Sequence, residues 1–266
     1  MNSIPKQAFF YWGTEVLPWV RFLTLKTFRQ HHPDWVIYLY LKPVLDKVEG
    51  FEQKNYLDSK ELVDLNLITF YIDIEKELGV EFPVKNFITI YADIFRYVIL
   101  DKFGGFYCDM DCLFFKSLET LGIDDINYDT FILPRPYHHF LLSKPQSLYI
   151  KKTLEEQLDH IDEFSTNFLI TTSCTTNVNI TDEDKVWMLP LHTTEENIGS
   201  DGPYYSDSIC LNWHGSGWHK RYETITENNY KELDHPLAAA IRYCLHRNTG
   251  KPTSLGNFLW IDRGED

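Results

Sequence analysis

Two aspartates separated by one residue are the clearest candidates for chemistry in this sequence. Asp109 and Asp111 stand in an aromatic stretch, residues 106–115, which we expect to be extended. Side chains alternate between the faces of an extended chain, so both carboxylates should point the same way and Met110 the other way. Neighbouring carboxylates repel each other unless a hard divalent cation such as Mg²⁺ or Mn²⁺ lies between them. The spacing therefore predicts a metal site, although two solvated aspartates in a turn would give the same pattern.

A charged pair precedes this motif, in the helix that we expect at residues 89–103. Asp93 and Arg96 are spaced i,i+3 in an apolar stretch and so share one helix face. Gly104-Gly105 ends the helix and turns the chain back, which brings that face toward the aspartates. One interpretation is a salt bridge turned to solvent. We prefer the other, in which the carboxylate binds sugar hydroxyls and the guanidinium places positive charge near a sugar and a diphosphate.

Strands and helices alternate along the chain, which predicts an α/β fold with a mostly parallel central sheet flanked by helices. We expect strands at residues 8–12, 36–41, 67–72, 130–134 and 168–172, helices at residues 18–32, 147–161 and 237–246, and a polar helical insertion within residues 44–64. Residues 179–208 are rich in loops and are a candidate lid or acceptor region.

The composition restricts the partners and the location. The 266 residues carry a formal charge of −14 with no run of Lys or Arg, which disfavours nucleic acid as a ligand. An anionic ligand would need a metal ion or a few local cations. The sequence shows no signal peptide and no apolar stretch that could span a bilayer, so we expect a cytoplasmic protein, or one peripheral to a membrane.

The five cysteines are odd in number and scattered, and we interpret them as reduced core thiols. Cys108 and Cys112 could form half a zinc site, but no second pair of ligands completes it.

The helix and the motif together resemble a known family. Residues 92–97 (ADIFRY) and 104–111 (GGFYCDMD) resemble the DXD sugar-binding region of a glycosyltransferase family. That family includes capsular-polysaccharide enzymes, the yeast mannosyltransferase that initiates outer chains and, more distantly, the large clostridial glucosylating toxins. The opening of the chain is also similar to the family, and the resemblance covers residues 4–118.

The resemblance implies a GT-A type, Rossmann-like nucleotide-binding fold in one domain over residues 1–266. Residues 1–118 would bind the nucleotide-sugar, and residues 119–266 would form the acceptor side and a C-terminal closing loop. The implied reaction moves a hexose from a UDP- or GDP-sugar to a glycan or another hydroxyl acceptor, with Mn²⁺ or Mg²⁺ and with retained anomeric configuration. The alternatives are a catalytically silent module that binds nucleotide-sugars or glycans and, ranked last, a metal-dependent phosphohydrolase.

The resemblance also assigns roles to single residues. Asp93 and Arg96 would contact the donor sugar, Asp109 the ribose and the metal, and Asp111 the metal directly. The remaining assignments are Trp12 stacked on the base (or an ordinary core tryptophan), His214 as the third metal ligand with Asn212 as its competitor, and Ser216 with Trp218 at the diphosphate. Residues 137–140 depart from the family pattern, and we interpret His138 and His139 as ordinary loop residues.

Overall fold

The structure, a computed structural model, is built around a seven-stranded sheet. It describes residues 3–45, 55–71, 74–79, 88–124, 127–134, 138–161, 178–189, 194–195, 204–205, 208–213, 225–246 and 260–261. In sheet order the strands are β3 (Ile68–Tyr71), β2 (Val36–Leu45), β1 (Gln7–Thr14), β4 (Gly105–Cys108), β7 (Phe140–Ser143), β6 (Thr130–Ile132) and β8 (Val186–Met188). β7 is antiparallel to both its neighbours, and the other neighbouring pairs are parallel. The predicted α/β class with a mostly parallel sheet is confirmed.

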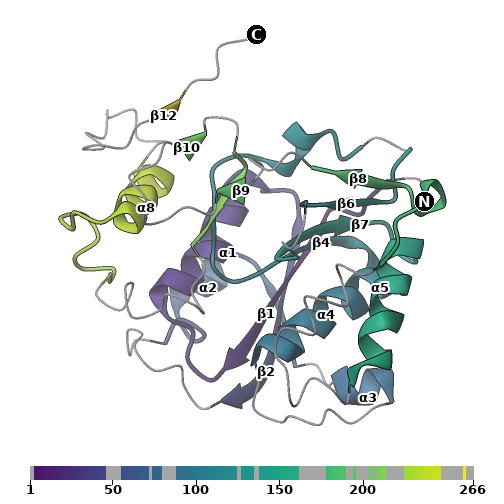
Figure 1. The fold of residues 1–266 in the computed structure, drawn as a ribbon. Coiled ribbons are helices and arrows are strands. Elements are labelled where there is room, and N and C mark those ends of the chain that lie inside the picture. The colour runs from purple at the N-terminus through teal and green to yellow at the C-terminus, as the bar shows by residue number, and fades with distance from the viewer. Residues whose placement is uncertain are drawn as a thin grey trace.

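Helices cover both faces of this sheet (Figure 1). α4 (Ile88–Phe103) and α5 (Leu148–Asp159) lie over one face, and α1 (Trp19–His31) lies over the other. The apolar cluster on the α1 side also includes residues of α8 (Pro236–His246) and of a second sheet, formed by β5 (Cys112–Phe114), β11 (Cys210–Asn212) and β9 (Thr194–Glu195). The remaining elements are short: α2 (Lys60–Asp64), α3 (Ile74–Leu78), η1 (Leu118–Leu121), η3 (Asp182–Asp184), β10 (Tyr204–Tyr205) and β12 (Trp260–Ile261).

Glycine is required at both positions after α4, because the backbone has a positive φ there and neighbouring atoms leave no room for a Cβ. Gly104 has φ +64° and its N–H donates to the carbonyl of Leu100 at 2.8 Å, which closes the helix as predicted. Gly105 has φ +104°, and a Cβ there would lie 2.5 Å from the carbonyl oxygen of Gln7. Any larger residue would therefore push β4 away from β1.

The structure differs from the sequence prediction in three places. Residues 109–111 form a turn between β4 and β5 rather than part of one extended segment. β2 continues to Leu45, so the helical part of the predicted insertion is limited to α2 within the described residues. β7 and β8 were not predicted, because strands of three or four residues are too short to show a period. The predicted strand at residues 168–172 lies outside the described residues.

Four of the five cysteines are described, and all four are buried. Cys108, Cys112, Cys210 and Cys244 form no disulfide. Cys174 lies outside the described residues.

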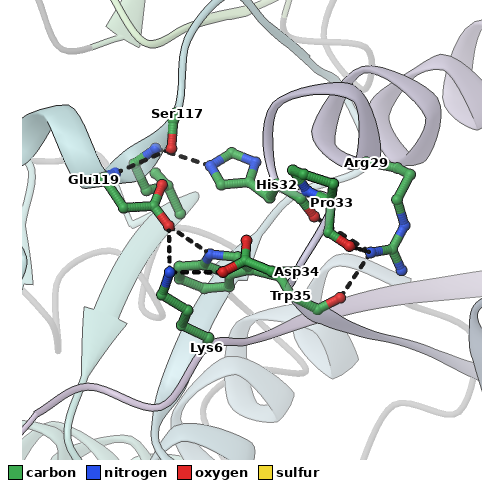
Figure 2. A network of polar contacts seen from close by, with 9 residues as sticks. Lys6, Arg29, His32, Pro33, Asp34, Trp35, Ser117 and Glu119 are labelled. Carbon is green, nitrogen blue, oxygen red and sulfur yellow. Dashed lines mark hydrogen bonds and ion pairs between the residues drawn. The ribbon is translucent and has the colours of Figure 1, made fainter.

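A polar network joins the chain segments at the amino ends of the parallel strands (Figure 2). Lys6, which precedes β1, donates to Asp34 at 2.7 Å and lies 3.1 Å from Glu119. Trp35, which precedes β2, donates its indole N–H to the same Glu119 carboxylate at 3.0 Å. The network fixes the starts of both strands. It lies at the end of the sheet opposite to the turn that follows β4.

His32, at the end of α1, is the buried member of this region. Its Nε2 accepts the Leu118 N–H at 2.8 Å, so Nδ1 carries the proton and donates to the Phe28 carbonyl at 2.9 Å. The ring is stacked on Phe28 with centroids 4.0 Å apart. Burial lowers the pKa of His32 from 6.5 to about 4, because the charged ring would lose its hydration.

This histidine predicts acid sensitivity of the fold. The unfolded chain takes up a proton near pH 6.5 and the folded chain only near pH 4, so the free energy of unfolding falls as the pH drops through this window. We expect His32→Gln to lower stability at pH 8 and to flatten this decline, by at most about 1.4 kcal/mol per pH unit. Urea unfolding at several pH values measures both effects, with His160→Gln on the surface as the control. Equal slopes for the wild type and His32→Gln would contradict the assignment.

Candidate functional site

The candidate site lies at one edge of the central sheet. β1 and β4 are parallel and end at this edge, and the antiparallel β7 begins there, with Cys108 paired to Phe140. The turn that carries Asp109 and Asp111 follows β4 directly, and the N–H of Asp109 donates to the His139 carbonyl at 3.0 Å. The topology therefore brings three chain segments to the two aspartates.

Apolar and acidic side chains alternate along residues 108–112, and convergence of the two carboxylates on one ion stays a prediction. Cys108, Met110 and Cys112 belong to the same apolar cluster and are at most 3% exposed. The side chains of Asp109 and Asp111 are 29% and 10% exposed. Asp109 is therefore partly exposed, whereas Asp111 is buried beside the apolar cluster that contains Met110.

Arg96 of α4 is the centre of a network that includes the first aspartate of the motif. Its Nη2 donates to Asp93 Oδ1 at 2.6 Å and to Asp109 Oδ1 at 3.3 Å. Its Nη1 donates to the His138 carbonyl at 2.7 Å. The alternative of a pair turned to solvent is therefore wrong, because Arg96 is 5% exposed and points to the motif.

Tyr107 completes this network and was not identified from the sequence. Its hydroxyl donates to Asp109 Oδ1 at 2.6 Å, and the Arg96 guanidinium lies 5.0 Å from its ring centroid. Burial lowers the pKa of Arg96, but the carboxylates of Asp109 and Asp93 outweigh it, so the pKa is raised above its ordinary value. Arg96 therefore remains cationic at every working pH.

A second arginine contacts the other aspartate of the motif, and it was also missed. Arg21, in the first turn of α1, places Nη1 3.4 Å from Asp111 Oδ2. Its guanidinium lies 4.6 Å from the ring centroid of Trp213 and 5.5 Å from that of Trp12. Burial lowers the pKa of Arg21, and the carboxylates of Asp111 and Asp109 act in the opposite direction. Both aspartates therefore lie within electrostatic reach of this one guanidinium.

Trp12 is buried at the end of β1. It is 5% exposed, and its indole N–H donates to the Val16 carbonyl at 2.9 Å. The ring belongs to the apolar core, which was the alternative to a base-stacking role, and stacking on a nucleotide base stays a prediction.

The third metal ligand was expected from the segment after β11. Asn212 pairs in register with Cys112 and is 2% exposed, and the N–H of Trp213 donates to the Asp111 carbonyl at 2.9 Å. β11 thus ends beside the motif. His214, Ser216 and Trp218 lie outside the described residues. Among the residues that the structure describes, no three His, Cys, Asp or Glu side chains converge as a metal site.

The histidines before β7 are more than ordinary loop residues. The backbone carbonyls of His138 and His139 accept from Arg96 and from Asp109, respectively. The His138 ring also contacts Tyr97, whose hydroxyl lies 3.1 Å from Nδ1. Because these bonds use backbone carbonyls, residue identity in the sequence gave no signal of them.

The charges of the site indicate what it can bind. The carboxylates of Asp93, Asp109 and Asp111 face two guanidiniums, which leaves one negative charge in excess among these five groups. An anionic diphosphate would meet an excess of negative charge here unless a divalent cation were bound with it. Asp109 offers a partly exposed carboxylate and Asp111 a buried one, and carboxylate oxygens suit Mg²⁺ or Mn²⁺, so the residues present fit such an ion.

Comparison with known proteins finds a family that matches part of the chain, including the residues of α4 and the motif. Residues 21–128 match the family described as "Glycosyltransferase sugar-binding region containing DXD motif". No curated protein matches the chain. In the described part of the chain, no helix has the length and apolar character needed to cross a membrane.

Several solved glycosyltransferase structures are similar to the chain at low identity. The PaToxG glycosyltransferase is 18% identical over 64% of this chain and 67% of its own, with a TM-score of 0.45. The galactosyltransferase LgtC is 12% identical over 93% of this chain and 98% of its own, with a TM-score of 0.44. The catalytic domain of the alpha-toxin from Clostridium novyi is 12% identical over 67% of this chain and 65% of its own, with a TM-score of 0.39.

Proposed function

We propose that the protein is a metal-dependent hexosyltransferase, because residues 21–128 match the family of glycosyltransferase sugar-binding regions that contain a DXD motif. It moves a hexose from a UDP- or GDP-sugar to a hydroxyl group of a glycan or another acceptor, with retained anomeric configuration. The observation that carries the proposal is the network in which Arg96 joins Asp93 of α4 to Asp109 of the motif.

The two charged groups of α4 bind the donor sugar in this proposal. The Asp93 side chain is 23% exposed, so its carboxylate can accept hydrogen bonds from sugar hydroxyls. Arg96 keeps its positive charge beside the sugar and the diphosphate, where negative charge develops as the sugar leaves. Its bonds to Asp109 and to the His138 carbonyl hold the guanidinium in place before the donor arrives.

The motif and the segment after β11 hold the metal and the diphosphate. Asp109 would face the ribose and the metal, and Asp111 would coordinate the metal directly. His214 or Asn212 would be the third ligand, Ser216 and Trp218 would contact the diphosphate, and Trp12 would stack on the base. A divalent ion bound here offsets the charge of the departing diphosphate.

The acceptor needs no base from the protein in this mechanism. The leaving phosphate oxygen takes the proton of the acceptor hydroxyl as that hydroxyl bonds to the anomeric carbon on the same face. The sugar passes through an oxocarbenium-like state between breaking the old bond and forming the new one. The chain contributes orientation and a fixed electrostatic field.

Donor hydrolysis tests the proposal without knowledge of the acceptor. The protein is incubated with Mn²⁺ and a panel of UDP- and GDP-sugars, and nucleotide release is followed by chromatography. We expect slow release from one donor, its loss with EDTA and its recovery when Mn²⁺ is restored.

A parallel thermal-shift series separates the enzyme from a silent binding module. Ligands that bind only the folded state raise the melting temperature whether or not they react. A donor that raises the melting temperature but never releases nucleotide would indicate a silent module. No shift and no release with any donor would contradict the proposal as a whole.

A further inference from the structure

Arg21 is buried, and its guanidinium lies close to two tryptophan rings and to the second aspartate of the motif. The residue is 8% exposed, and its guanidinium carbon lies 4.6 Å from the ring centroid of Trp213 and 5.5 Å from that of Trp12. Its Nη1 is 3.4 Å from Asp111 Oδ2. The guanidinium therefore bridges the first turn of α1, the end of β1, the end of β11 and the second aspartate of the motif.

Each aspartate of the motif has its own arginine, and the two arginines differ in their other contacts. Arg96 holds Asp109 and is itself held by Asp93 and by the His138 carbonyl. Arg21 contacts Asp111 while its flat faces rest on aromatic rings, which attract a cation without forming directional hydrogen bonds to it.

The burial of Asp111 makes a countercharge necessary before any metal arrives. The residue is 7% exposed, and a carboxylate so deep would be costly to leave ionised without a neighbouring positive charge. The guanidinium provides that charge. A divalent ion on the same carboxylate would be repelled by it, because two positive charges would share one negative group.

We propose that Arg21 is the resident countercharge of Asp111, which stabilises the metal-free protein and competes with the divalent ion for this carboxylate. It is a positioning residue that sets the metal affinity, with no contact to the reacting atoms. The inference rests on the proposed function, since it takes Asp111 as a metal ligand.

The test measures Mn²⁺ binding to the full chain by titration calorimetry, without nucleotide. We expect Arg21→Met to bind Mn²⁺ about tenfold more tightly than the wild type, because the competing charge is gone. We also expect the melting temperature of the variant to be lower in EDTA and to rise more on adding Mn²⁺, since the ion then supplies a countercharge to Asp111 in place of the guanidinium. A purely structural role would lower the melting temperature equally with and without Mn²⁺.

Arg21→Lys is the matched control, because it keeps the charge and loses the planar stacking group. Its Mn²⁺ affinity should stay close to that of the wild type, and a gain equal to that of Arg21→Met would overturn the inference.

Should Arg21→Met not fold even with Mn²⁺, Arg21→Gln is measured in the same way, and no gain in affinity there would overturn the inference. If the wild type itself binds no Mn²⁺, the metal assignment fails together with the inference. If the wild type binds Mn²⁺ and the uncharged variants bind it no more tightly, the inference alone fails.

Discussion

Asp111→Asn should reduce metal-dependent nucleotide release by about two to three orders of magnitude while the protein stays folded. The amide keeps the size of the side chain, and the Asp111 carbonyl keeps its bond from the Trp213 N–H. The lost negative charge removes both the proposed metal ligand and an ion-pair partner of the buried Arg21. We therefore expect cooperative melting at a lower temperature, with a loss of stability of roughly 3 kcal/mol. Initial rates with saturating donor and a Mn²⁺ titration measure the first effect, and circular dichroism measures the second.

Asp34→Asn provides the matched control for that experiment. Asp34 forms an ion pair with Lys6 at the opposite end of the strands, and its side chain is 58% exposed. The same chemical change there should leave nucleotide release unaltered. Activity of Asp111→Asn equal to that of Asp34→Asn would rule out Asp111 as an essential metal ligand.

The part of the site that the sequence predicts well is the part encoded by local geometry. Asp93 and Arg96 are one helical turn apart, and a glycine pair then returns the chain to the sheet, so their approach to Asp109 follows from helix and turn rules. The α/β class follows in the same way from the alternation of long strands and helices. Arg96 and Asp109 do lie 3.3 Å apart, as these rules predict for the helix and the turn.

The residues that were missed depend on contacts between distant segments. Arg21 meets Asp111 because α1 and the motif turn start from the same sheet edge, 90 positions apart in the sequence. The carbonyls of His138 and His139 reach the site because β7 runs antiparallel to β4. The residue types of a four-residue strand do not predict its direction in the sheet. Tyr107 is the exception, because its partner Asp109 is only two positions away, and the bond from its hydroxyl to that carboxylate is a local one.

Arg96→Lys should lower kcat/KM for donor hydrolysis by about a hundredfold, even though the charge is kept. A single ammonium group cannot reach Asp93, Asp109 and the His138 carbonyl at the same time, which the fork of the guanidinium does. Because at least one hydrogen bond to a partly exposed carboxylate is lost, the free energy of unfolding should fall by about 2 kcal/mol. We expect the loss mainly in kcat, because the guanidinium acts on charge that develops as the bond to the sugar breaks.

Arg29→Lys separates the catalytic part of this effect from the structural part. Arg29 also ties separate segments together, donating to the carbonyls of Leu65 at 2.9 Å and Trp35 at 2.7 Å, but it lies at the opposite end of the strands. The substitution should therefore cost stability and leave kcat unchanged at a temperature where both variants are folded. If Arg96→Lys loses no more activity than Arg29→Lys at that temperature, the guanidinium of Arg96 only braces the fold, and the charge it presents to the donor has no part in the reaction.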